Sequence, residues 1–132
     1  MTVILLPPEC IKKLSDLSHN LRLDRNIVCR IALGSSLQQG VIENTGNRML
    51  DGIEVDLSSI LKHEDELFKT LLRHSIKNEI SKENMTKLIN AHIIRGIDLL
   101  TQLYIRKNSS VDFFKSLCGD DGEILLDMAS IN

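Results

Sequence analysis

The chain begins with a short apolar run at residues 3–6, Val-Ile-Leu-Leu, which stops at two prolines. Because proline cannot donate to a sheet ladder, this pattern predicts a strand or an extended arm over residues 3–6. The prolines suit the first turn of a helix, where their missing N–H groups would have no intrahelical acceptor. Apolar residues then recur on one helical face at Cys10, Leu14, Leu17 and Leu21. The first elements are therefore a strand and a helix.

A second helix is predicted after Asp24, whose short carboxylate side chain is a favourable N-cap. Its apolar stripe repeats at helical spacing and consists of Ile27, Val28, Ile31, Ala32 and Leu37. Gly40 marks its end, because glycine commonly follows a helix C-terminus.

Residues 40–63 form the clearest loop of the chain, because glycine, asparagine and aspartate are concentrated there. Within this loop, residues 53–57 alternate apolar and acidic side chains, which predicts a short extended segment. A connection of this length is uncommon in a compact domain. It is either an ordered functional loop or a mobile excursion.

Two further helices are predicted downstream. The third runs from about His63 to Asn78 and carries acidic residues in its first turn, where the helix dipole favours negative charge. The fourth begins at a Ser81 cap and reaches about Arg106. Its apolar arc covers about half the circumference, which favours contact with another subunit. A small docking helix is expected beyond it, with Phe113, Phe114 and Leu117 on its inner face.

A chain of 132 residues is expected to form one domain with a sizeable core. Seven glycines and two prolines are too few for a many-turned sandwich. The fold class predicted is mainly α: a compact, oligomeric helical domain of about four helices. Its N-terminal half has the strand–helix–helix order of a ribbon-helix-helix unit.

The formal net charge of −2 conceals an asymmetry. Residues 1–107 hold 15 lysines and arginines against 13 acidic residues, whereas residues 108–132 hold one lysine against five acidic residues. We therefore divide the chain into a slightly basic domain, 1–107, and an acidic tail, 108–132. A basic body is compatible with a polyanionic partner.

The sequence favours a cytoplasmic protein. No apolar run approaches the length of a membrane span, and the first residues lack the charged segment of a signal peptide. The three cysteines, Cys10, Cys29 and Cys118, are odd in number and form no C-x-x-C pair. Reduced, buried thiols are expected rather than a disulfide framework or a zinc site.

No catalytic motif identifies itself. The chain contains no P-loop, no dinucleotide fingerprint, no H-E-x-x-H and no G-x-S-x-G. The four histidines are scattered, so we expect no metal site and no cofactor. Cys29 lies beside Arg30, which could activate the thiol, although core packing is the simpler interpretation. The sequence leans away from an enzyme and leaves DNA nicking open.

Three residues of the fourth helix permit structural and functional interpretations. His92 lies within the apolar arc, where a hydrogen-bonded core or interface histidine is the simplest interpretation. Arg95 could extend to solvent, reach a subunit interface or bind a phosphate. Gly96 costs a helix about 1 kcal/mol relative to alanine, which predicts a close approach of a second helix.

The first forty residues resemble a ribbon-helix-helix unit, in which a polar ribbon from two subunits enters the major groove. Here the corresponding segment, residues 2–6, has almost nothing that could hydrogen-bond a base edge. This departure counts against an ordinary repressor or antitoxin, which remains an alternative.

A wider resemblance covers about residues 10–104. The segments 21–40 (LRLDRNIVCRIALGSSLQQG), 67–73 (LFKTLLR) and 91–100 (AHIIRGIDLL) are similar, in order, to blocks of the DndE family of the bacterial DNA phosphorothioation system. The family pattern falls on Asn26, Cys29, Arg30, His92, Arg95 and Gly96.

The resemblance implies a helical, tetramer-forming component that binds DNA with a preference for nicked duplex. It also implies that the chemistry belongs to separate partners: a cysteine desulfurase, an ATP-pyrophosphatase-like protein and an ATPase. No catalytic role is transferred to the matching residues.

From charge and placement, the residues predicted to contact DNA phosphates are Arg22, Arg25, Arg30, Arg73 and Lys77. Backbone N–H groups at the start of the second helix would add to this site. Basic residues 62, 69, 73 and 77 share one face of the third helix and form either a solvated surface or a phosphate track. A structural adaptor that does not bind DNA is the other alternative.

Overall fold

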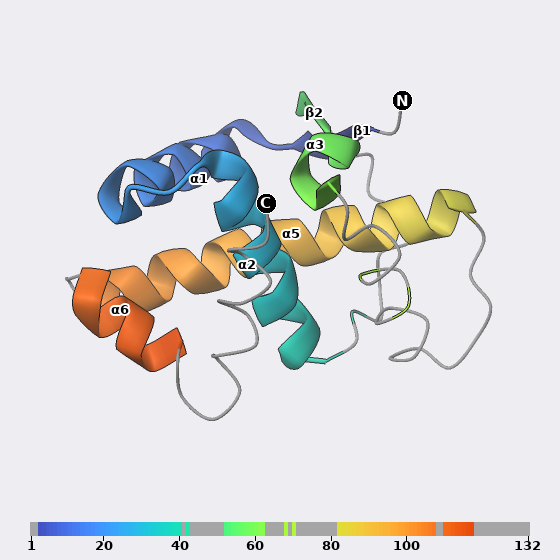
Figure 1. The fold of residues 1–132 in the computed structure, drawn as a ribbon. Helices are drawn as coiled ribbons and strands as arrows, with labels where there is room; N and C mark the ends of the chain where they lie inside the picture. Colours follow the sequence, from blue (N-terminus) through green and yellow to red (C-terminus); the bar gives the residue numbers. More distant parts are fainter. Residues whose placement is uncertain are drawn as a thin grey trace.

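The computed structural model describes residues 3–40, 42, 52–62, 68, 70, 82–107 and 110–117. In chain order its elements are β1 (Val3–Leu6), α1 (Pro8–Leu21), α2 (Arg25–Gln38), β2 (Ile53–Asp56), α3 (Leu57–Leu61), α5 (Lys82–Lys107) and α6 (Ser110–Leu117). The mainly α fold class is confirmed. The long helix α5 runs along the molecule, with the β1–β2 sheet and α3 toward one end and α6 at the other (Figure 1).

The predicted strand pairs within its own chain. β1 and β2 form an antiparallel two-stranded sheet in which Ile4 is opposite Val55 and Leu6 is opposite Ile53. The other edge of β1 is occupied by the buried amide of Asn90 on α5. Its Oδ1 accepts from the Leu5 N–H at 2.7 Å, and its Nδ2 donates to the Leu5 carbonyl at 3.0 Å. Asn90 thus takes the place of a neighbouring strand.

This pairing differs from a ribbon-helix-helix protein, in which the strand pairs with its counterpart in a second copy. The expected element order, strand then two helices, is present. The backbone groups of β1 that a second copy would need are taken by β2 and by Asn90. A shared ribbon would therefore require one of these two contacts to break.

The first helix follows its sequence pattern closely. Pro8 is its first residue, and no backbone acceptor is needed there because proline has no N–H. All four residues predicted to face inward are buried: Cys10, Leu14, Leu17 and Leu21. One exposed ion pair joins α1 to α5, with Lys13 Nζ 2.8 Å from Asp98 Oδ1.

Helix α2 crosses α5 near the middle of the latter (Figure 1), and Gly96 lies at the crossing. A Cβ built on Gly96 would overlap the backbone carbonyl of Ala32 and come within 2.8 Å of the Ala32 Cα. The close helix approach predicted from this glycine is confirmed. The contact is backbone against backbone, so no side chain can move aside to relieve a substitution.

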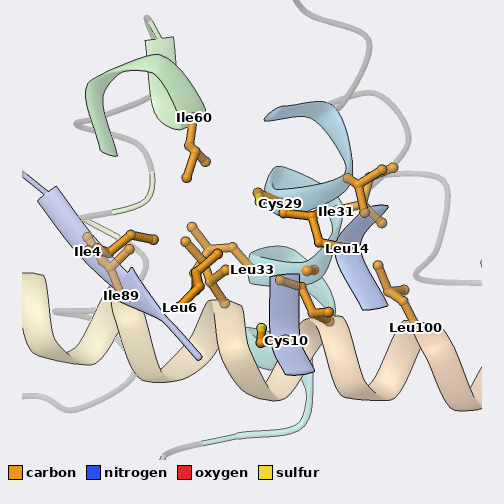
Figure 2. Packing of buried hydrophobic residues seen from close by; sticks show 14 of the residues in the cluster. Ile4, Leu6, Cys10, Leu14, Cys29, Ile31, Leu33, Ile60, Ile89 and Leu100 are labelled. Atoms are coloured by element: carbon orange, nitrogen blue, oxygen red, sulfur yellow. The ribbon is translucent and has the colours of Figure 1, made fainter. Parts of the chain in front are cut away.

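The core lies between these elements, and Figure 2 shows Ile4 and Leu6 of β1, Leu33 of α2 and Ile60 of α3 gathered over α5. All four are at most 1% exposed. Phe113 of α6 is also fully buried and lies edge-on to Tyr104 of α5, with ring centroids 6.0 Å apart. The small docking helix is therefore confirmed. It begins at Ser110, after residue 107, where we placed the end of the predicted basic domain.

The segment expected to be a loop contains two elements. The alternating residues form β2, as predicted, but the helix α3 that follows it was not anticipated. Asp56 starts this helix because its carboxylate accepts from the Ser58 N–H at 3.0 Å and from the Ser59 hydroxyl at 3.0 Å. The Ser81 cap, the acidic tail beyond residue 117 and most of the predicted third helix lie outside the described residues. Phe68 of that helix is described and fully buried.

No helix among the described residues combines the length and the apolar character needed to cross a membrane.

Replacement of Gly96 by alanine is predicted to destabilise the fold by about 2–3 kcal/mol, because the added methyl group must separate two backbones. Urea unfolding followed by circular dichroism measures the change. Gln102→Ala is the matched control, since Gln102 is exposed on the same helix, and it should change the unfolding free energy by less than about 0.5 kcal/mol. Equal stabilities for Gly96→Ala and the control would contradict the crossing described above.

Candidate nucleic-acid interface

The corner between α1 and α2 is built by local hydrogen bonds. Helix α1 ends at Leu21, and the next residue, Arg22, has a left-handed backbone with φ of 56°. The Leu23 N–H donates to the Ser18 carbonyl at 3.1 Å, and the Ser18 hydroxyl donates back to the Leu23 carbonyl at 2.5 Å. These bonds satisfy carbonyls at the end of the helix and fix the direction in which the chain leaves it.

The start of α2 is capped as predicted. Asp24 accepts a hydrogen bond from the Asn26 N–H through its side chain, at 3.3 Å. The capping carboxylate is an anion that already occupies the N-terminus of the helix. The expected binding of phosphate to free N–H groups at this helix start is therefore disfavoured, because a phosphate would have to displace or tolerate the Asp24 charge.

The predicted DNA-contacting residues separate into three groups. Arg22 and Arg25 are exposed on either side of Asp24. Arg30 is 1% exposed, inside the domain, so its guanidinium is not presented to a ligand on the surface of the described chain. Arg73 and Lys77 lie outside the described residues. The structure thus brings two of the five together, at the α1–α2 corner.

A buried polar network joins the C-terminal end of α2 to α5. Arg95 Nε donates to the Ser36 hydroxyl at 2.7 Å, and Arg95 Nη2 donates to the carbonyls of Ser36 and Gly40 at 2.5 and 2.6 Å. The Ser36 hydroxyl lies 2.8 Å from Nδ1 of His92. Arg95 therefore caps the C-terminal end of α2: it donates to the Ser36 carbonyl, which also accepts from the Gln39 N–H at 3.0 Å, and to the Gly40 carbonyl just beyond the helix.

The network also holds His92 in place. Arginine only donates, so the Ser36 hydroxyl accepts from Arg95. A second hydrogen bond joins the Ser36 hydroxyl to His92 Nδ1, and its direction is set by the imidazole tautomer. Burial, and secondarily the charge of Arg95, lower the pKa of His92 to about 4. The prediction of a hydrogen-bonded core histidine is confirmed.

Ser36 and His92 are the residue types of a nucleophile–base pair, but a substrate could not reach them. Ser36 and His92 are both buried, and Arg95 and His92 already occupy the Ser36 hydroxyl. The pKa of Arg95 is lowered by burial as well. The hydrogen bonds of Ser36, His92 and Arg95 hold α2 against α5.

The buried thiols are poor nucleophiles. Burial raises the pKa of Cys29 to about 12 and that of Cys10 to about 11. The thiolate is the reactive form, so neither side chain reacts readily at neutral pH. Activation of Cys29 by Arg30 would require a lowered thiol pKa, whereas burial raises it, so core packing is the role that the structure supports.

Within the described part of the chain, no three or more histidine, cysteine, aspartate or glutamate side chains gather in a way that could hold a metal ion.

Two of the residues that organise this region escaped the sequence analysis. Ser36 and Asn90 are polar and buried, and each bonds to a segment 56 or 85 positions away. The spacing of His92 and Arg95 on one helix face was visible, but nothing in the sequence pairs them with Ser36. Arg30 was placed on the surface because of its charge, and its burial has no local sequence signal.

Comparison with known protein families identifies the family of this chain. The model of the family described as DNA sulphur modification protein DndE matches residues 8–108. The searches of curated proteins and of solved structures returned no match. The matched range extends from the start of α1 to just beyond α5, so it includes both the α1–α2 corner and the Ser36–His92–Arg95 network.

Arg95→Met is predicted to destabilise the protein by about 2 kcal/mol, since it removes the cap of α2 while keeping side-chain length. Chemical denaturation at neutral pH measures the loss. Arg106→Met, at an exposed position of the same helix, should stay within about 0.5 kcal/mol of the parent. A similar small effect for both variants would show that the cap contributes little.

Acidification is predicted to destabilise the protein through His92. Its pKa is about 4 when folded and about 6.5 when unfolded, so the unfolded state binds more protons between these values. Stability from this group is complete above pH 6.5 and falls by up to about 3 kcal/mol as the pH drops toward 4. In His92→Asn, whose amide oxygen can accept from Ser36, this part of the pH dependence should vanish. Parallel stability–pH curves for the parent and this variant would contradict the assignment.

Proposed function

Since the chain belongs to the DndE family of DNA sulphur modification proteins, we propose that it is the DNA-binding component of the phosphorothioate modification system. In this proposal it binds duplex DNA through the phosphate backbone, as a homotetramer, and prefers nicked duplex. Family membership on residues 8–108 is the observation that carries the proposal. The modification system is the context that this membership implies.

The exposed cations of the α1–α2 corner support backbone contact. Arg22 and Arg25 are held at a rigid turn, and arginine forms charge-assisted, often bidentate hydrogen bonds with phosphate. Such contacts position a protein on DNA without reading its sequence. Arg73 and Lys77 remain predicted contacts, and Arg30 is left out because it is buried.

The proposal assigns the chemical steps to separate partner proteins. Sulfur mobilisation and ATP hydrolysis would reside in a cysteine desulfurase, an ATP-pyrophosphatase-like protein and an ATPase, with which this protein would act. The buried thiols and the buried Ser36–His92 pair are consistent with a protein that presents DNA rather than one that reacts with it.

The repressor alternative is less well supported. A ribbon-helix-helix repressor reads bases with polar side chains of an intermolecular ribbon. Here β1 is apolar, pairs with β2 and has its other edge bonded to Asn90. One observation favours the adaptor alternative: Ile105 on α5 is 70% exposed, and a protein partner could cover it.

The proposal predicts that the purified protein binds intact and nicked duplexes of unrelated sequences, that nicked duplex binds more tightly, and that affinity falls steeply with salt. Fluorescence anisotropy across a salt series measures this. Preference for a single operator-like sequence would favour the repressor. No affinity at low salt, with partner proteins that co-purify after nuclease treatment, would favour the adaptor.

Arg22→Gln with Arg25→Gln is predicted to weaken binding to every duplex and to reduce the salt slope by about 2, because two phosphate contacts are lost. The matched control is Lys12→Gln with Lys87→Gln. These lysines are exposed on α1 and α5, away from the corner, and their replacement removes the same charge. An equal loss in both double variants would contradict a localised interface.

A further inference from the structure

The last turn of α5 carries two exposed cations, Arg106 and Lys107, that the sequence analysis did not assign to any site. We propose that these two residues and the α1–α2 corner form one continuous phosphate-binding surface at the end of the molecule where α1 and α5 both terminate. We call this surface the basic end: Arg22, Arg25, Arg106 and Lys107. The inference rests on the proposed function and names the surface that performs it.

The two helices reach this end together. They run in the same direction, from the side of the β1–β2 sheet toward the side of α6 (Figure 1), and the Lys13–Asp98 bond joins them part-way along. From Lys13 to the end of α1 there are eight residues, or about 12 Å, and from Asp98 to the end of α5 there are nine, or about 14 Å. The two ends therefore lie at nearly the same level.

The ion pair is informative about position rather than about stability. Its side chains are 41% and 47% exposed, so its contribution to folding is small. It nevertheless shows which residues of α1 and α5 lie side by side at that point. The hydrogen bond to Asp98 also raises the pKa of Lys13.

The four cations are available for a ligand. All four side chains are exposed, and no ion pair joins any of them to a carboxylate elsewhere in the described ranges. The Lys13 ammonium, by contrast, is occupied by Asp98. A phosphate that approached the basic end would thus meet guanidinium and ammonium groups without first breaking an internal ion pair.

The charge balance of the basic end remains positive after its acids and helix dipoles are counted. Four cations face Asp24 at the start of α2 and Asp112 in the first turn of α6. The C-terminal dipoles of α1 and α5 and the N-terminal dipoles of α2 and α6 cancel one another at about half a charge each. Among the described residues, a net charge of about +2 is left before Lys115 of α6 is counted. Because the helix dipoles cancel one another, this positive charge is not needed to neutralise them.

The geometry favours an extended polyanion over a single small anion. The cations come from three separate places, the end of α1, the start of α2 and the end of α5, rather than converging on one point. No buried polar side chain is part of the set. Separate contacts of this kind match successive phosphates along a nucleic-acid backbone.

The test is the salt dependence of duplex binding by the full chain, measured with an arbitrary-sequence duplex that carries one nick. Arg106→Gln with Lys107→Gln should lower the salt slope by about 2 and weaken binding at 0.1 M salt by about tenfold to a hundredfold. Lys12→Gln with Lys87→Gln, on the other halves of the same two helices, should keep the parental slope. Arg106→Lys with Lys107→Arg conserves both charges and should retain binding, which separates charge loss from misfolding.

The outcomes distinguish this inference from the function it rests on. If the parent protein does not bind duplex DNA at low salt, both fail. If the parent binds but Arg106→Gln with Lys107→Gln keeps the parental slope, the proposed function stands and the basic end is wrong. An equal fall in slope for the Lys12 and Lys87 double variant would also overturn it, because charge anywhere on the surface would then suffice.

Discussion

The backbone contact between Gly96 and Ala32 is the constraint from which the other features of this fold follow. Because no side chain separates the two helices, their distance cannot adjust by a change of rotamer. Four residues after Ala32 lies Ser36, and four residues before Gly96 lies His92, so one turn away the same contact becomes a polar one. The Arg95 cap is next to Gly96 and depends on the same approach. The crossing and the end of α2 are therefore fixed together.

Helix α5 also determines what the N-terminal strand can do. Asn90 lies two residues before His92 and offers one acceptor and one donor to the backbone of Leu5. A buried amide with both groups satisfied replaces a second strand at little energetic cost, whereas an unpaired strand edge would be open to another chain. The strand–helix–helix order of a DNA-binding ribbon protein is thus present, but β1 pairs with β2 of its own chain. Strand order in a sequence does not specify which strand becomes the partner.

The parts of the structure that the sequence predicted are those in which burial follows a local period. The inner face of α1, the Asp24 cap and the close approach at Gly96 each depend on residues within one or two turns of each other, or on a single missing side chain. Helix α3 has five residues, which is too short for a helical period to be recognised. The Ser36–His92–Arg95 network could not be predicted from the sequence, because Ser36 is more than fifty positions away from His92 and Arg95. Two arginines of the candidate interface, Arg22 and Arg25, could be predicted from the sequence. The cations of α5 could not, because their place in the surface depends on where α1 ends relative to α5.

Burial, rather than residue type, decides which cations can serve a ligand. Arg95 is half-buried and donates to three oxygen acceptors, which hold its guanidinium in place. The same side chain cannot reorient toward a phosphate without uncapping α2. An exposed cation at a helix end gains only a few tenths of a kcal/mol to about 1 kcal/mol from the dipole, so little of its interaction energy is committed to folding. The formal charge of −2 for the whole chain therefore says little about its affinity for a polyanion. What matters is the local excess of uncommitted charge, and that excess is found where α1 and α5 end.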